Sequence, residues 1–191
     1  MGLVMIVLVV LFVVAVVYVV MLYNGLVQLK HAVGKAWANI DVLLKQRHDE
    51  LPKLVETCKQ YKEFEQSTLE RVIAARNRVH EARQQQDMPA LGQAESALRS
   101  GLGAIFAVAE AYPDLKTNDT FQHLLSRISG LENAVADRRE FYNESVNLYN
   151  VRLEQFPDVL IAGMFHFTPR SLLEFSDEEK RDVDIKQLFS A

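Results

Sequence analysis

The residues whose types suit chemistry are few, and the first group of them is His48-Asp49-Glu50. An imidazole beside two carboxylates offers metal ligands, or a proton donor and acceptor. A helical zinc motif also needs a second histidine one turn away on the same face. The histidines of this chain are instead dispersed, at His31, His48, His80, His123 and His166. We therefore interpret the triplet as a solvated helix terminus and predict no metal ligands.

The chain has a single cysteine, Cys58, so it cannot form an intrachain disulfide. A nucleophilic thiolate needs a neighbouring base or an electropositive setting, and the surrounding sequence displays neither. Cys58 lies on an apolar stripe of a predicted helix, where a small buried thiol is common. We favour the buried thiol.

Glu65 and Arg138 interrupt predicted apolar stripes on different helices. Charged groups that are buried usually pair, which predicts an ion pair or hydrogen bond between helices for these two side chains. A general acid or base in a cleft is the functional alternative, and no second carboxylate supports it.

Tyr142-Asn143 and Tyr149-Asn150 are seven residues apart and therefore lie on the same helix face. Such a ladder can recognise a partner. We prefer the alternative, in which the rings pack and the polar ends are satisfied within a helical bundle.

These residues do not combine into a reaction centre. We predict that the protein is not an enzyme, has no catalytic, cofactor-binding or metal-binding residues, and takes no cofactor or small-molecule substrate. With 21 basic and 25 acidic residues the net charge is -4, so no basic face for nucleic acid is indicated.

The N-terminal segment Gly2–Leu22 contains no charged residue. As a helix it would be about 31 Å long, which matches a hydrocarbon core of about 30 Å. Tyr18 and Tyr23 suit the interface at its end. A basic n-region and an Ala-x-Ala site are both missing, so we predict a retained single-pass anchor in the lipid bilayer and not a cleaved signal peptide.

The orientation follows from the first charges after the span. Lys30 and Lys35 precede Asp41, the first acidic residue. The positive-inside rule then predicts an external N-terminus and a cytoplasmic helical domain.

Beyond Asn24-Gly25, where a bend is permitted, apolar residues at spacings of three and four predict a helix over Leu26–Gln86. The seven-residue pattern is interrupted at Arg47, Glu65 and Thr68 but keeps its register. We expect one long helix kinked near Asp49–Leu51 by Pro52. The alternative is two helices joined by a tight turn capped by Asp49.

Two further helices are predicted. The first has Asp87 as N-cap and Pro89 in its first turn, and ends at about Tyr112, before Pro113. Its small apolar second half should be buried, with Gly101 and Gly103 permitting close helix contact. The second runs from about Asp119 to Gln155, is capped by Thr117 or Asn118 and is stopped by Pro157.

The predicted architecture is all-α: a transmembrane anchor (1–22), an antiparallel bundle of long helices (23–157) and an apolar C-terminal segment with a charged tail (158–191). The segment Val159–Phe175 either makes intermolecular contacts or folds over the end of its own bundle.

Several stretches together resemble the LemA family of bacterial membrane-anchored proteins over nearly the whole chain, to about Phe167, in conserved order and spacing. They are Tyr23–Val27, Ala36–Val42, Leu44-Lys45, Arg47, Asp49, Leu51-Pro52, Leu54–Thr57, Ala109–Lys116, Asn118, Phe121, Leu124, Arg138, Tyr142-Asn143, Tyr149-Asn150 and Phe156-Pro157.

The resemblance implies a helical bundle behind one helix in the bacterial cell (inner) membrane, and some members of the family are genetically linked to membrane-embedded proteases. The chain departs from the family where Val55–Tyr61 lacks the usual glycine before the aromatic residue, and after Phe175. The family's name has also been attached to a sensor kinase, but no kinase motif occurs here.

The sequence therefore favours a membrane-anchored scaffold or assembly protein that forms homo-oligomers. The alternative is a regulatory adaptor of a membrane protein partner, such as a membrane-embedded protease.

Overall fold

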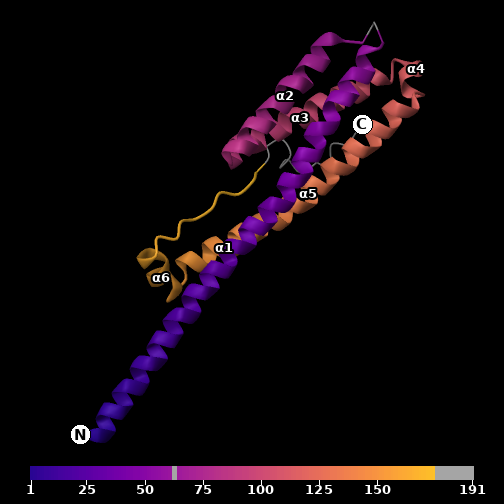
Figure 1. The fold of residues 1–191 in the computed structure, drawn as a ribbon. Helices are drawn as coiled ribbons and strands as arrows, with labels where there is room; N and C mark the ends of the chain where they lie inside the picture. The colour runs from indigo at the N-terminus through magenta and orange to yellow at the C-terminus, as the bar shows by residue number, and fades with distance from the viewer. Residues whose placement is uncertain (62–63, 175–191) are drawn as a thin grey trace, which may run out of the picture. The chain divides into compact units, whose positions relative to one another are not determined.

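The structure is a computed structural model that describes residues 1–61 and 64–174 (Figure 1). Within these ranges it contains helices and no strand, which confirms the all-α prediction. The helices are α1 (Gly2–Lys59), α2 (Gln66–Gln85), α3 (Met88–Ala109), α4 (Pro113–Lys116), α5 (Asp119–Glu154) and α6 (Asp158–Met164).

The described chain forms two compact units. Unit 1 consists of Met1–Ile40 and Asp137–Leu172, and unit 2 consists of Asp41–Ala136 together with Leu173 and Glu174. Two of the three boundaries, after Ile40 and after Ala136, fall inside long helices, so α1 and α5 each contribute to both units.

The N-terminal part of α1 is the predicted apolar helix. Residues 1–21 are all exposed, and Leu22 is the first buried residue of the chain. Helix α1 is long and apolar enough to cross a bilayer, and it is the only one of the described helices that meets both conditions. The helix continues through Asn24 and Gly25 without interruption, so the bundle begins on the same helix as the anchor.

The prediction of one helix over Leu26–Gln86 is wrong, and so is the alternative of a turn at Asp49. Helix α1 passes through Pro52 and ends at Lys59, and α2 begins at Gln66. Proline has no amide hydrogen, so Pro52 leaves the carbonyl of His48 without its donor in the helix. The Nε of Arg76, on α2, donates to this carbonyl over 3.0 Å. The helix therefore tolerates Pro52 because a side chain from the next helix replaces the missing donor.

The break lies instead between α1 and α2, at the polar residues that interrupt the apolar pattern. Glu65 is the N-cap of α2, and its carboxylate accepts hydrogen bonds from the hydroxyls of Ser67 and Thr68 over 2.7 and 2.9 Å. These bonds lower the pKa of Glu65. Just before the break, Tyr61 is fixed by its hydroxyl, which donates to the carbonyl of Asp114. Glu65 therefore binds the first turn of α2 through two hydroxyl groups and not through its backbone amides.

Helices α2 and α3 form an antiparallel hairpin in unit 2, visible in Figure 1. Gln86, in the left-handed region (φ 53°), ends α2, and Asp87 caps α3 as predicted, accepting from the amide of Ala90 over 3.0 Å. The two helices approach closely at Gly101, where a Cβ would lie 2.9 Å from Cγ2 of Val72.

The predictions for α3 and α5 hold with three corrections. The small apolar second half of α3 is buried only in part, since Ala107 is exposed and Ala104, Phe106 and Val108 are half-buried. Gly103 is exposed and has no atom within 4 Å of its Cβ position, so it makes no close contact. Helix α3 ends at Ala109 and not at Tyr112, followed by the short α4. Asn118 is the cap of α5, since its Oδ1 accepts from the amide of Phe121 over 2.9 Å.

In unit 1, α1 packs antiparallel to α5 and contacts the residues that follow α6. Trp37 contacts Tyr142 near the start of the α5 portion, with ring centroids 6.1 Å apart. Tyr23 contacts Phe165, just after α6, at 4.7 Å. Buried side chains between these contacts include Leu26, Val33, Ala36, Val146, Tyr149 and Leu153.

The role of Arg76 gives a first prediction. Arg76→Leu removes the donor to the His48 carbonyl and should lower the free energy of unfolding by about 1–3 kcal/mol, because that carbonyl is then unsatisfied. In a Pro52→Ala background the amide of residue 52 supplies the donor, so the same substitution should cost less. Urea unfolding of the four proteins in detergent, followed by circular dichroism, gives the difference.

Arg78→Leu is the matched control, since Arg78 is an exposed arginine on the same helix. It should cost the same in both backgrounds. Equal costs of Arg76→Leu with and without Pro52 would show that Arg76 does not replace the missing amide.

Candidate functional site

A buried ion pair lies at the centre of unit 2. The side chains of Arg47 and Glu95 are each only 3% exposed. Nη2 of Arg47, on α1, hydrogen-bonds both carboxylate oxygens of Glu95, on α3. Nη1 of Arg47 lies 3.8 Å from Oε1 of Glu132, on α5. One guanidinium therefore connects three helices.

Glu50, one turn after Arg47 on α1, extends this network. Its carboxylate is 9% exposed and lies 3.0 Å from Nζ of Lys53 and 3.1 Å from Nε of Arg127, on α5. Arg47, Glu50 and their partners thus connect helices by paired charges, which is how a bundle accommodates charges that it buries.

The sequence-predicted triplet His48-Asp49-Glu50 does not form a site. The three residues lie inside α1 and not at a helix terminus, and their side chains have different partners. Asp49 bonds exposed Lys45 over 2.8 Å, and this bond lowers the pKa of the carboxyl group. Among residues 1–61 and 64–174 no group of three or more histidine, cysteine, aspartate or glutamate side chains is placed to hold a metal.

His48 instead joins α1 to α2. Its Nε2 lies 2.7 Å from Nη2 of Arg76, and its ring stacks on His80 with centroids 4.7 Å apart. Arginine has only donors, so Nε2 must accept and the neutral ring carries its proton on Nδ1. Burial, followed by the charge of Arg76, lowers the pKa of His48 from its ordinary 6.5.

Cys58 is fully buried, as expected for a packed thiol. Burial raises its pKa to about 12, which leaves no appreciable thiolate near neutral pH.

The prediction of an ion pair between helices for Glu65 and Arg138 is wrong. Both residues are exposed, and Glu65 forms its hydrogen bonds within the first turn of α2.

The tyrosine–asparagine ladder packs within the protein, as the sequence favoured. Tyr142 donates to the carbonyl of Ser171 over 3.0 Å, and Tyr149 donates to that of Thr168 over 3.1 Å. The amide of Asn150 both donates to the carbonyl of Arg170 and accepts from its backbone N–H. The ladder therefore holds the extended backbone of residues 168–171 against α5.

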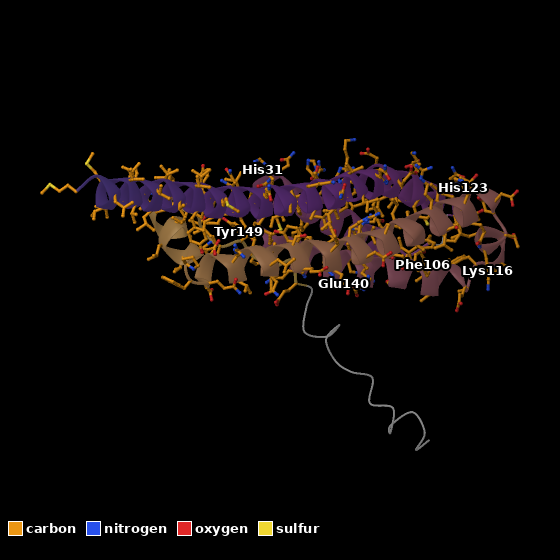
Figure 2. The ribbon with its side chains drawn as sticks, turned by 90° about the horizontal axis from the view of Figure 1, so that it is seen from below. His31, Phe106, Lys116, His123, Glu140 and Tyr149 are labelled. Carbon is orange, nitrogen blue, oxygen red and sulfur yellow. The ribbon has the colours of Figure 1, made fainter. Side chains whose placement is uncertain are left out.

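Burial raises the pKa of Tyr142 and of Tyr149, so both hydroxyls remain donors at physiological pH. In Figure 2 the labelled Tyr149 lies on the side of α5 that faces α1, where it is 1% exposed. The ladder's function is thus to position the segment after α6, of which the structure describes residues to Glu174.

A second aromatic cluster lies where α1 becomes buried. The ring of Tyr23 contacts those of Phe165 and Phe167 at 4.7 and 5.8 Å. Nζ of Lys30 lies 5.8 Å from the centre of the Phe167 ring, within range of a cation–π interaction. The cluster anchors the end of α6 to α1 directly after the apolar stretch.

A hollow of about 470 Å³ opens beside the turn between α1 and α2. Among the described residues that line it, Lys59 and Glu70 are charged and none is a histidine or cysteine. The other described lining residues are Tyr61, Phe64, Gln66, Leu69 and Ile73.

The Arg47–Glu95 pair gives a second prediction. Glu95→Gln should cost about 3–5 kcal/mol of unfolding free energy, because it leaves the guanidinium buried without its counter-charge. The double variant Arg47→Met/Glu95→Leu should cost less unfolding free energy than the sum of its two single substitutions. Neither Arg47 nor Glu95 is then left as a buried charge without its partner. Asp49→Asn, which breaks an exposed pair on the same helix, should leave the urea midpoint almost unchanged. Additive costs would contradict the coupling of Arg47 to Glu95.

His48 gives a pH prediction. Its pKa is lower in the folded than in the unfolded protein, so protonation favours unfolding. The stabilisation by neutral His48 is complete above pH 6.5, the pKa of the histidine in the unfolded protein. It is lost as the pH falls from there through the lower pKa of the folded protein. His48→Gln can still accept from Arg76 but does not titrate, so it should flatten the fall in urea midpoint between about pH 7.5 and 5.5. His31→Gln, at an exposed histidine (Figure 2), should keep the wild-type slope, and an unchanged slope in His48→Gln would refute the assignment.

The chain is similar in sequence to several known proteins. The magnetosome protein MamQ 2 of Paramagnetospirillum magneticum is 28% identical over 100 residues, which cover 52% of this chain and 37% of that protein. The magnetosome protein MamQ of Magnetospirillum gryphiswaldense is 32% identical over 68 residues, or 36% of this chain and 25% of that protein. The chain thus spans well under half of these relatives.

The protein LemA of Metamycoplasma hominis is similar over a longer range. It is 24% identical over 165 residues, which cover 86% of this chain and 74% of that protein. Residues 36–187 of the chain match the LemA family. This range contains Arg47, Glu50, Glu95 and the tyrosine–asparagine ladder, and it shows that the chain belongs to the LemA family.

Proposed function

We propose that this LemA-family protein is a membrane-anchored helical scaffold whose copies assemble side by side, and that it acts by assembly and not by catalysis. The observation that carries the proposal is an apolar stripe on the exposed side of α5 in unit 1. Phe141, Leu148 and Val151 are 50%, 54% and 44% exposed. Phe141 and Leu148 directly precede the buried Tyr142 and Tyr149, so the stripe is an outer face of a helix whose inner face is already occupied.

The spacing of this stripe suits a second helix. Its residues follow one another by seven and then three positions, the pattern of the a and d positions in a coiled coil. The flanking charges differ in sign between the two edges. Exposed Glu140 lies on one edge and exposed Arg138 on the other.

The anchor supports the same conclusion by mass action. Copies that share one bilayer have the same orientation and are confined to a plane, which raises their effective concentration. Even a short contact of three apolar side chains per copy then contributes to assembly. Closed rings are expected if neighbours meet through two different faces, and dimers if the stripe pairs with itself.

The experiment measures the mass of the detergent-extracted full-length protein by light scattering across a range of concentrations. The wild type should form oligomers, and Leu148→Glu should shift it to the monomer because it places a charge within the contact. Val42→Glu is the matched control. Val42 has the same exposure, 54%, and lies on α1 outside the stripe, so this variant should keep the wild-type mass.

A wild-type protein that is monomeric at every concentration, or a Leu148→Glu variant with unchanged mass, would overturn the proposal. A monomer that co-purifies with one membrane enzyme would favour the adaptor role instead.

A further inference from the structure

Helix α6 presents apolar side chains to the outside, and no other element among residues 1–61 and 64–174 covers them. Leu160 and Met164 are 60% and 67% exposed, and Phe156 and Phe165 on either side of the helix are 80% and 50% exposed. Only Ile161 and Ala162 turn their apolar side chains inward. A short helix that buries one edge and exposes the rest is normally polar on its exposed face, and this one is not.

The place of α6 along α1 identifies what it faces. Tyr23 directly follows the last residue of the apolar span, and its ring contacts Phe165 and Phe167. Residues 1–21 of α1 are exposed throughout, and burial begins at Leu22. Figure 1 shows α6 beside α1, at the point beyond which the N-terminal part of α1 has no neighbour. The exposed apolar side chains of α6 are therefore at the level where α1 enters the bilayer.

The charges around α6 fit the same environment. From Val159 to Pro169 the chain contains no Lys, Arg, Asp or Glu. Asp158, the one acidic residue of the helix, is turned inward, 3% exposed and paired with Arg152 over 2.7 Å. The cations around the helix are Arg152, which pairs with Asp158, Lys30, whose ammonium lies beside the Phe167 ring, and exposed Arg170. This is an apolar surface with its acid removed and basic side chains at its rim, which is the composition of a segment that lies in a membrane interface.

We propose that α6 with Phe156 and Phe165 inserts into the headgroup–acyl boundary of the bilayer that α1 spans, giving the protein a second point of membrane contact. The apolar side chains enter the acyl region to a depth of about 5–10 Å, as in other interfacial helices. Tyr23 and Phe167 lie at headgroup level, where amphipathic and aromatic rings are enriched. Lys30 and Arg170 face the lipid phosphates. The proposal does not depend on self-assembly, since each copy makes this contact on its own.

The test is quenching of tryptophan fluorescence by brominated lipid in the reconstituted full-length protein. The chain has one tryptophan, Trp37, so Trp37→Phe provides a silent background. In that background Leu160→Trp and, separately, Met164→Trp introduce one reporter each on α6. The vesicles consist of phosphatidylcholine brominated either near the glycerol end or near the middle of the acyl chains. Both reporters should be strongly quenched, and more by the shallow bromines than by the deep ones.

Ala38→Trp in the same background is the matched control. Ala38 is exposed and lies 16 residues after Leu22 on the same helix, about 24 Å along its axis, so it should not be quenched. Circular dichroism verifies that each variant retains its helices.

Two outcomes would overturn the proposal. Reporters on α6 that are quenched no more than Ala38→Trp are not in lipid. Reporters whose emission is blue-shifted but unquenched are covered by protein, which would assign the α6 surface to a second copy or another partner.

Discussion

The packing of unit 2 depends on the buried guanidinium of Arg47. A charge with 3% exposure is stable only if its partners are fixed, and the partners here come from two other helices. Glu95 must therefore face α1 from α3, and Glu132 must approach from α5. Apolar contacts alone tolerate a shift of one helix along another, whereas a charge pair with both oxygens engaged does not. Arg47 thus sets which turns of the three helices meet.

The same requirement, that every buried polar group has a partner, explains how α1 accommodates proline. Pro52 frees the carbonyl of His48, and Arg76 donates to both that carbonyl and the His48 ring. The proline therefore creates an acceptor on α1 that only a neighbouring helix can satisfy. What reads in the sequence as a helix breaker is, in the folded protein, part of the contact between α1 and α2.

The sequence predicts the helices well where local chemistry determines them. The apolar span and the Asp87 cap follow from residue type alone, and the structure contains both. Residue type does not distinguish Gly101, which makes a close contact, from Gly103, which makes none. The turn between α1 and α2 is different, because the seven-residue apolar pattern keeps its register across it. Periodicity therefore cannot distinguish one long helix from two, and only the polar residues Glu65 and Thr68 signal the break.

Tertiary partners explain the remaining errors at the candidate sites. Arg47 appears in the sequence as an interruption of an apolar stripe, and nothing local identifies Glu95, 48 positions away, as its partner. Conversely, Glu65 looks like a candidate for pairing because it lies on the same stripe, but the chain turns there and exposes it. The sequence predicts correctly that the rings of the tyrosine–asparagine ladder pack within the bundle and that their polar ends form hydrogen bonds there. Their acceptors, the carbonyls of residues 168–171, lie in a segment with no periodic pattern.

The membrane contact and the assembly stripe have a physical connection. A single transmembrane helix leaves a protein free to rotate about the helix axis and to tilt. A second contact beside it, made by α6, restricts both motions, because rotation would lift the apolar side chains of α6 out of the interface. The ladder and the Tyr23 cluster fix α6 to α5 and α1 within the same unit. The outer face of α5, with Phe141 and Leu148, then faces sideways toward neighbouring copies in the same membrane, at one height in every copy. Contacts between neighbours cost less orientational entropy under these conditions, so a short apolar stripe suffices where a free soluble helix would need a longer one.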